Sequence, residues 1–260
     1  MSLRINQNIA AMNAYRNLSV TDGQMSKSLE KLSSGFRINR AADDAAGLAI
    51  SEGLRSQVGG LKVGVRNAQD GVSVAQTAEG ALTEVHSMLQ RMNDLSVQHA
   101  NGTNSTESKA ALNAEFTALQ AEVVRITDNS TFNGVKLFTA GSLDFQVGSD
   151  AADKITVTTA AVPASVASAV ITDSASVQTA ITDVSKSRSD LGALQNRFEH
   201  TIASVNVAIE NLSASESRIR DTDMASEMVS FTRAQILSQA GTAMLAQANQ
   251  ASQGVLRLLQ

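Results

Sequence analysis

The sequence lacks cysteine and tryptophan, and it has one proline, Pro163, and one tyrosine, Tyr15. Without cysteine the chain forms no disulfide, no thiolate nucleophile and no zinc site built on sulfur. Aromatic residues make up only 3% of its 260 residues. Because aromatic side chains supply much of the buried area of a compact core, this composition disfavours a compact α/β enzyme.

Charge and hydropathy exclude further classes of protein. The net charge is −4 and the pI about 5.4, so we expect no nucleic-acid partner. Residues 234–256 carry no charge, but they include several carboxamide side chains that are too costly on a lipid-facing helix. We therefore predict no membrane span. The N-terminal residues lack the apolar core and cleavage site of a secretory signal peptide, so we expect any export to proceed without a cleaved signal.

Two long stretches repeat apolar residues in alternating steps of three and four. Hydrophobic residues are 43% of the chain, and the near absence of proline allows long helices. A sustained repeat of this kind predicts coiled-coil packing. The predicted fold is mainly α, a long antiparallel helical coiled-coil bundle with a small β-hairpin region. The first series is Leu54, Val58, Leu61, Val65, Ala68, Val72, Ala75, Leu82, Val85, Leu89 and Met92, and the second is Val177, Ile181, Val184, Leu191, Leu194, Phe198, Ile202, Val205, Ile209 and Leu212.

The stretch between these two series has a different residue pattern. Asn104 is predicted as the N-cap of a helix that ends near Asp128. Apolar residues then alternate with polar ones over 143–147 and again over 155–157, with a turn at Gly148 between them, which predicts a β-hairpin. Residues 158–176 are small and rich in hydroxyls, so we expect a variable surface connection that tolerates insertions.

Both ends of the chain are predicted to be amphipathic helices without an evident internal partner. Such ends pair with each other, with copies of the same chain or with a membrane. The first 42 residues are basic and the last 40 weakly acidic, a balance that suits pairing of the ends. The candidate assembly residues are Ile5, Ile9, Met12, Leu237, Met244, Val255 and Leu258.

Catalytic chemistry is hard to find in this sequence. The three histidines are scattered and form no zinc-peptidase pattern, and no phosphate-binding loop is present. Asp43 and Asp44 precede a predicted helix, where they serve better as a cap than as a metal pair. We predict that the protein is not an enzyme, with no catalytic residue, metal ligand or cofactor.

Several long motifs at both ends resemble one family. At the N-terminal end these are residues 4–6, 29–39, 41–51, 71–82 and 132–137, which include LEKLSSGFRIN and AADDAAGLAIS. At the C-terminal end they are 217–225, with the sequence SRIRDTDMA, together with 235–237 and 245–250. The chain resembles bacterial flagellin in all of these segments.

The resemblance implies a structural subunit that polymerises into the bacterial flagellar filament and serves motility. Such a subunit is exported unfolded through the flagellar type III pathway and becomes extracellular. Implied partners are further copies of the chain, an export chaperone, the filament cap and the hook–filament junction proteins. The stretch between Leu137 and Ile181 is too short for an outer globular domain. The expected segments are 1–42 and 221–260 for helical assembly, 43–176 for long helices, hairpin and variable connection, and 177–220 for a returning coiled-coil helix.

The resemblance also implies a host receptor. Residues 89–98 are similar to the flagellin stretch that Toll-like receptor 5 recognises. Arg91, Leu95 and Glu115 would then be the cation, the apolar anchor and the anion of the recognised patch. Arg91 and Leu95 are four residues apart and so share a helix face. Asn93 departs from the family, which often has a basic residue there.

Two alternatives share part of this pattern. A hook–filament junction protein has related terminal helices. A type III secreted translocator shares the alanine-rich helices, but it would need an apolar span of about 18 or more residues, which the sequence lacks.

Overall fold

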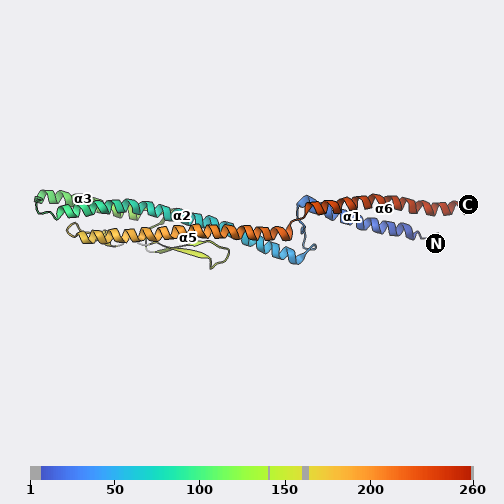
Figure 1. Cartoon of the computed structure of the whole chain (residues 1–260), viewed down its shortest axis with the longest axis horizontal. Coiled ribbons are helices and arrows are strands. Elements are labelled where there is room, and N and C mark those ends of the chain that lie inside the picture. Colours follow the sequence, from blue (N-terminus) through green and yellow to red (C-terminus); the bar gives the residue numbers. More distant parts are fainter. Residues whose placement is uncertain (1–6, 140, 160–163, 259–260) are drawn as a thin grey trace. The chain divides into compact units, whose positions relative to one another are not determined.

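The computed structural model describes residues 7–139, 141–159 and 164–258, and the chain divides into two compact units. The terminal unit comprises residues 1–56 and 212–260, and the central unit comprises residues 57–211. The predicted mainly helical fold with a small β-hairpin is confirmed (Figure 1). The elements are α1 (Ile9–Ser34), α2 (Ala45–His99), α3 (Thr106–Asn129), β1 (Thr131–Phe132), β2 (Val135–Lys136), β3 (Gly141–Gln146), β4 (Lys154–Thr159), α4 (Ala164–Ala167), α5 (Ser174–Arg220) and α6 (Met224–Leu258).

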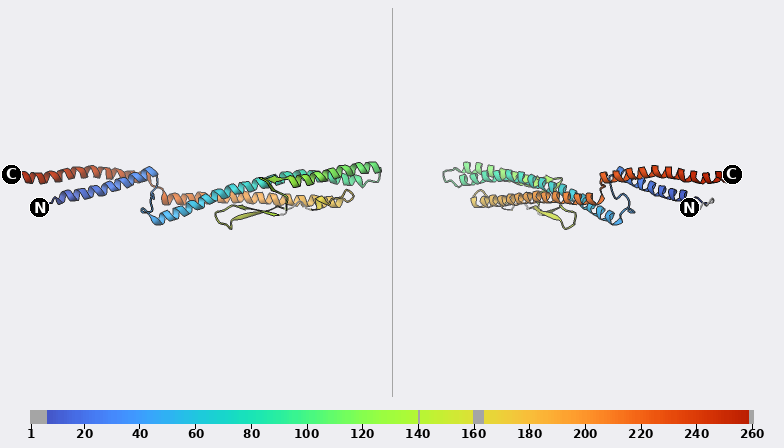
Figure 2. Two further views of the ribbon diagram at one scale, coloured as in Figure 1. Left: turned by 180° about the vertical axis from the view of Figure 1, so that it is seen from behind. Right: turned by 45° about the vertical axis from the view of Figure 1, so that its right-hand side comes forward.

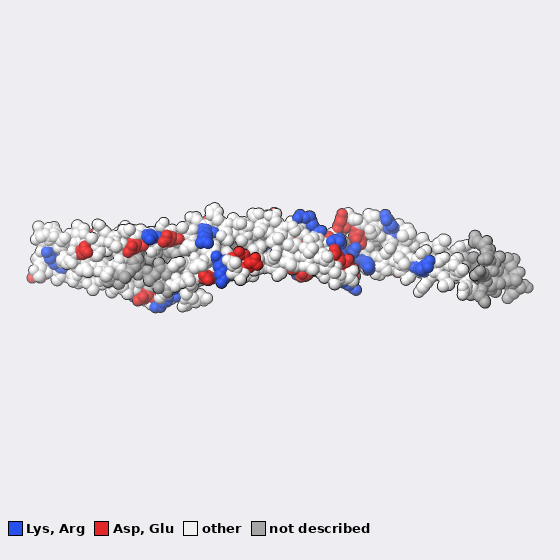
Figure 3. Space-filling model, turned by 90° about the horizontal axis from the view of Figure 1, so that it is seen from below, with Lys and Arg blue, Asp and Glu red and all other residues white. Residues whose placement is uncertain are grey.

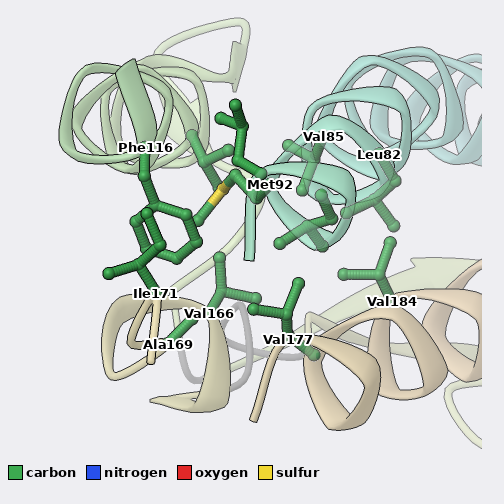
Figure 4. Packing of buried hydrophobic residues seen from close by; sticks show 13 residues of the cluster. Leu82, Val85, Met92, Phe116, Val166, Ala169, Ile171, Val177 and Val184 are labelled. Carbon is green, nitrogen blue, oxygen red and sulfur yellow. The ribbon is translucent and has the colours of Figure 1, made fainter. Parts of the chain in front are cut away.

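The main core of the central unit lies along the predicted coiled-coil seams. The described residues of both apolar series are buried or half-buried, as the repeat predicts. Figure 4 shows how α2 supplies Leu82, Val85 and Met92 to this core, while α5 supplies Val177 and Val184. The third helix, α3, closes the same core with Phe116, which is 2% exposed.

The hairpin forms where the alternation predicts it. Strands β3 and β4 are antiparallel, with Leu143 opposite Val157 and Phe145 opposite Ile155. Val157 and Ile155 are buried and pack on the helices, so the apolar side of the hairpin faces the core. The hairpin is thus part of the folded unit.

A single large side chain joins the hairpin to both long helices. Phe198 on α5 is completely buried and makes an edge-to-face contact with Phe145, with ring centroids 5.6 Å apart. On α2, Gly71 faces the same ring, and a Cβ atom at that position would lie 2.6 Å from Phe198 Cζ. Glycine is therefore required at position 71 for the helix to approach this ring.

The connection after the hairpin differs from the prediction. We expected residues 158–176 to be a variable surface connection, but α4 and the residues after it enter the main core. Val166, Ala169 and Ile171 are at most 6% exposed and pack against the α2 and α3 side chains. Only part of this stretch is therefore an exposed connection. Pro163 lies outside the described residues.

The start of α3 also differs by one residue. Ser105, and not Asn104, is the N-cap, because its hydroxyl accepts the backbone N–H of Ser108 at 3.2 Å. The Asn104 amide instead donates to the carbonyl of Gln98 at 2.6 Å. It therefore closes the loop between α2 and α3.

Helices α1 and α6 of the terminal unit lie side by side and run antiparallel (Figures 1 and 2). At one end Asn8 Nδ2 donates to the carbonyl of Ala248 at 2.9 Å, and at the other Lys31 pairs with Glu227 at 3.7 Å. The expectation that the ends have no internal partner is therefore wrong. Of the pairings left open by the sequence, pairing with each other occurs within the subunit.

Candidate functional site

The surface between α1 and α6 is made mostly of small side chains. Residues half-buried or buried along it recur in steps of three and four on both helices. Gly241 lies so close to Leu18 that a Cβ atom there would be 3.3 Å from Leu18 Cδ1. Of the described side chains of the two helices, only Ser28 and Ala234 are fully buried. The inner positions are Ala11, Ala14, Leu18, Thr21, Met25 and Ser28 on α1, and Phe231, Ala234, Ser238, Gly241, Leu245 and Ala248 on α6.

Many of the larger apolar side chains of the same helices point outward. Ile9 and Met12 on α1 are 55% and 66% exposed, and Leu237 and Met244 on α6 are 50% and 65% exposed. Exposed apolar surface of this extent marks a site of protein contact. We call this surface the outer face of the terminal pair. It also includes Tyr15, Val20, Leu29, Met224, Met228, Val229 and Ile236.

Four of the seven predicted assembly residues are thus exposed apolar residues on the outer face. Ile5 lies outside the described residues, and the side chains of Val255 and Leu258 are also outside the described part of the chain. On α6, Met228, Ile236 and Leu237 line a surface groove. The outer face is therefore grooved as well as apolar, which suits insertion of side chains from another surface.

Backbone and side-chain contacts tie the segment after α1 to the segment before α6. Phe36 and Asp221 form an isolated antiparallel bridge, and the N–H of Arg37 donates to the carbonyl of Arg220 at 2.6 Å. The Arg220 guanidinium lies 4.7 Å from the Phe36 ring centroid and donates to Glu52 Oε1 at 2.8 Å. Cation–π and ion-pair contacts together fix this arginine. The two connections flanking the terminal pair are thereby held together.

The paired acidic residues before α2 accept hydrogen bonds from the backbone, Asp44 as a cap of the helix and Asp43 from the loop that precedes it. Asp44 Oδ1 accepts the backbone N–H of Gly47 at 2.8 Å, which confirms the predicted cap. Asp43 Oδ2 accepts the backbone N–H groups of Arg40 and Asn39, and these hydrogen bonds lower the pKa of the Asp43 carboxyl. Both carboxylates are therefore used by the backbone. Within the described ranges, no group of three or more His, Asp or Glu side chains could hold a metal ion.

The structure places the predicted receptor residues in two environments, an exposed ion pair and the main core. Arg91 on α2 and Glu115 on α3 form an exposed ion pair, with Nη2 2.7 Å from Oε1. Leu95, by contrast, is 0% exposed and belongs to the main core. The role of Leu95 as the apolar anchor of the patch therefore stays a prediction, for a side chain that lies in the core. The neighbouring Ser96 is also buried, and its hydroxyl donates to the Ile171 carbonyl at 2.8 Å, which ties the segment after α4 to this part of α2.

Sequence reasoning missed this burial, although a signal was available. Leu95 lies three residues after Met92, which is a core position, and so it is on the same side of α2 as Met92. The inner seam of the terminal pair was also missed, because its positions are mostly alanine, serine and glycine. Large apolar residues usually predict a buried face, but many of those on α1 and α6 are exposed in the subunit.

Charged side chains of both signs are interspersed over the described part of the face shown in Figure 3, with no large basic field. This distribution agrees with the net charge of −4. Among the described residues, no helix combines the length and the apolar character needed to cross a membrane.

Comparison with known proteins matches both ends of the chain to one family. Residues 5–142 match the bacterial flagellin N-terminal helical region, and residues 175–259 match the bacterial flagellin C-terminal helical region. The chain is 53% identical to a flagellin of Halalkalibacterium halodurans, over 98% of this chain and 99% of that protein. It is 44% identical to a flagellin of Bacillus subtilis, over 99% and 100%. The crystal structure of Bacillus cereus flagellin matches 56% of this chain and 88% of that one, at 24% identity and a TM-score of 0.43.

Proposed function

Because this chain belongs to the bacterial flagellin family and is a structural subunit of the flagellar filament, we propose that it polymerises through the outer face of its terminal pair. The observation that carries this proposal is the packing of α1 and α6, which places small residues inside and Ile9, Met12, Leu237 and Met244 outside. Each of these side chains contributes about 1.5–3 kcal/mol when it is buried. Deletion of either terminal helix tests the proposal.

A filament follows if each subunit covers this face with the next copy. Contacts between unlike surfaces that repeat by a screw operation produce an open helical polymer. The seven predicted assembly residues would all take part, including Ile5, Val255 and Leu258. On this proposal segments 1–42 and 221–260 carry assembly, and 43–176 and 177–220 form the surrounding coiled-coil layer with its hairpin.

The subunit must also reach the growing filament, which is extracellular in this family. We propose export in an unfolded state through the flagellar type III pathway, without a cleaved signal peptide. An export chaperone would cover the outer face before export, and the filament cap and the junction proteins would contact it afterwards. The exposed apolar residues of α6 support such a chaperone, because they need a cover before a neighbouring subunit is available.

The alternatives are not favoured. The flagellins of Halalkalibacterium halodurans and Bacillus subtilis match this chain over nearly their whole length. Neither is a junction protein or a translocator.

The family is structural, and we infer that this chain has no catalytic activity. The aspartate pair before α2 supports this inference, since Asp44 caps the helix and Asp43 accepts backbone N–H groups of the preceding loop.

Insertion of a short epitope between Ala151 and Ala152 is expected to preserve motility. Both residues are exposed in the turn between β3 and β4, so the insertion leaves the core intact. The same insertion beside Leu61 or Ile202 is expected to abolish motility by shifting the helical seams. Swimming assays compare the three strains, with subunit secretion measured as the control. Equal motility in all three would contradict the assignment of the hairpin turn to the outside of the filament.

We also propose a revised receptor patch for Toll-like receptor 5. The exposed ion pair of Arg91 and Glu115 would make the polar contacts, and Leu95 would support the patch from the core below it. The ion pair joins α2 to α3, so the patch has a defined shape in the free subunit. This proposal rests on the resemblance of residues 89–98 to the recognised stretch of flagellin.

Replacement of Arg91 by alanine is expected to raise the concentration for half-maximal receptor signalling about tenfold, since an interface arginine often contributes more than ~1 kcal/mol. The matched control is Arg125→Ala, which removes another exposed arginine that pairs with a glutamate, Glu122 on α3. Helix content, measured by circular dichroism, should stay the same in both variants. If Arg91→Ala and Arg125→Ala signal equally, Arg91 is not part of the patch.

A further inference from the structure

Four methionines present their thioethers to solvent on the terminal pair. Met12 on α1 is 66% exposed, and Met224, Met228 and Met244 on α6 are 48%, 52% and 65% exposed. Met92, in the core of the central unit, is 0% exposed. Because oxidation of methionine requires access to its sulfur, an oxidant in solution reaches these four side chains before it reaches Met92.

The four sulfur atoms lie on the outer face, so this inference rests on the proposed function. Met228 shares the α6 groove with Ile236 and Leu237. A methionine side chain is unbranched and polarizable, which lets it fit the irregular surface of a neighbour. A sulfoxide at the same place is polar and chiral, and its burial without a hydrogen-bond donor is unfavourable. Oxidation would therefore oppose the contact that assembly makes.

We propose that Met12, Met224, Met228 and Met244 form an oxidation site that controls polymerisation of the free subunit, with a peroxide as the oxidant. One oxygen atom passes from hydrogen peroxide to each sulfur, so an S–O bond forms and the O–O bond breaks. The sulfur loses two electrons and becomes a sulfoxide, and the peroxide is reduced to water. In the filament the same sulfur atoms are covered, so the polymer resists a dose that inactivates the free subunit.

The full-length free subunit is treated with hydrogen peroxide until peptide mass spectrometry shows sulfoxide at the four positions and an intact thioether at Met92. We expect the critical concentration for polymerisation to rise about tenfold or more. Treatment with methionine sulfoxide reductase is expected to restore the starting value. Unchanged polymerisation of a subunit oxidised at all four positions would overturn the proposal. Failure to recover after all four thioethers have been restored would also overturn it.

Two variants assign the effect to these positions. Replacement of all four methionines by leucine keeps a similar apolar volume without sulfur, and the critical concentration of this variant should be the same before and after peroxide treatment, whatever its starting value. The matched control, with Met25 and Met88 replaced by leucine, should remain sensitive. Met1, outside the described residues, is retained in both. A four-leucine variant as sensitive as the wild type would overturn the proposal. If that variant does not polymerise untreated, the reductase experiment on the wild type decides.

The same measurements separate the two proposals. If untreated subunits that lack residues 1–30 still polymerise, the proposed assembly surface is wrong. If those truncated subunits fail to polymerise while fully sulfoxidised full-length subunits polymerise normally, the assembly surface stands and the oxidation site does not.

Discussion

Deletion of residues 1–30, or of residues 231–260, is expected to abolish polymerisation while the central unit remains folded and helical. Each deletion removes most of one helix of the terminal pair and its exposed apolar residues. Loss of even two such side chains raises the critical concentration about a hundredfold or more, because each contributes about 1.5–3 kcal/mol and 1.4 kcal/mol is a factor of ten. Electron microscopy and sedimentation measure polymerisation, and circular dichroism measures the remaining helix.

Substitutions test whether polymerisation needs the apolar side chains of the outer face, and not only the two helices that carry them. Met12→Ser and Met244→Ser, made together, remove exposed apolar side chains and are expected to weaken polymerisation strongly. The matched control, Asn17→Ser with Gln247→Ser, changes exposed polar residues on the same two helices and should have little effect. Filaments formed by a subunit that lacks residues 1–30 or residues 231–260 would contradict the assembly proposal.

Replacement of Phe198 by alanine is expected to lower the free energy of unfolding of the central unit by about 3–5 kcal/mol. The ring is fully buried, it contacts Phe145, and it fills the space opposite Gly71. Urea unfolding followed by circular dichroism measures the loss.

Val207 on the same helix provides the control for this substitution. It is 57% exposed, so Val207→Ala should change the free energy of unfolding by less than about 0.5 kcal/mol. If Phe198→Ala and Val207→Ala are equally stable, the packing of the hairpin against α5 is not a source of stability.

Much of the central unit follows directly from its sequence. The alternating steps of three and four residues identify both long seams, because a position that faces the partner helix at every turn must be apolar. Likewise, the alternation around residues 143–147 and 155–157 predicts the hairpin and its apolar side. These patterns succeed because they describe surfaces that are buried within a single subunit.

The terminal pair was harder to predict because two surfaces compete on each helix. The inner seam uses alanine, serine and glycine, which allow close approach but give a weak apolar signal. The stronger signal comes from the outer residues such as Met12 and Met244, which are exposed in the subunit. A sequence pattern shows that a face is apolar, but it does not show whether the same chain or another copy covers it.

The remaining errors arose where small or single residues decide the packing. Val166, Ala169 and Ile171 are too widely spaced to stand out in a stretch rich in serine and threonine, yet they complete the main core. Leu95 was assigned to the receptor patch because it shares a helix face with Arg91. In the structure the segment after α4, which is distant in sequence, contacts this part of α2 through the hydroxyl of Ser96.

The most direct test of the outer face uses the absence of cysteine from the chain. A single cysteine introduced by Met12→Cys or Met244→Cys reacts with a maleimide at one defined position, and Ala151→Cys in the exposed hairpin turn is the control. We predict that the cysteines at positions 12 and 244 react readily in the free subunit and are protected in the filament, whereas the cysteine at position 151 reacts in both. Equal reactivity of the cysteines at 12 and 244 in the free subunit and in the filament would contradict assembly through the outer face.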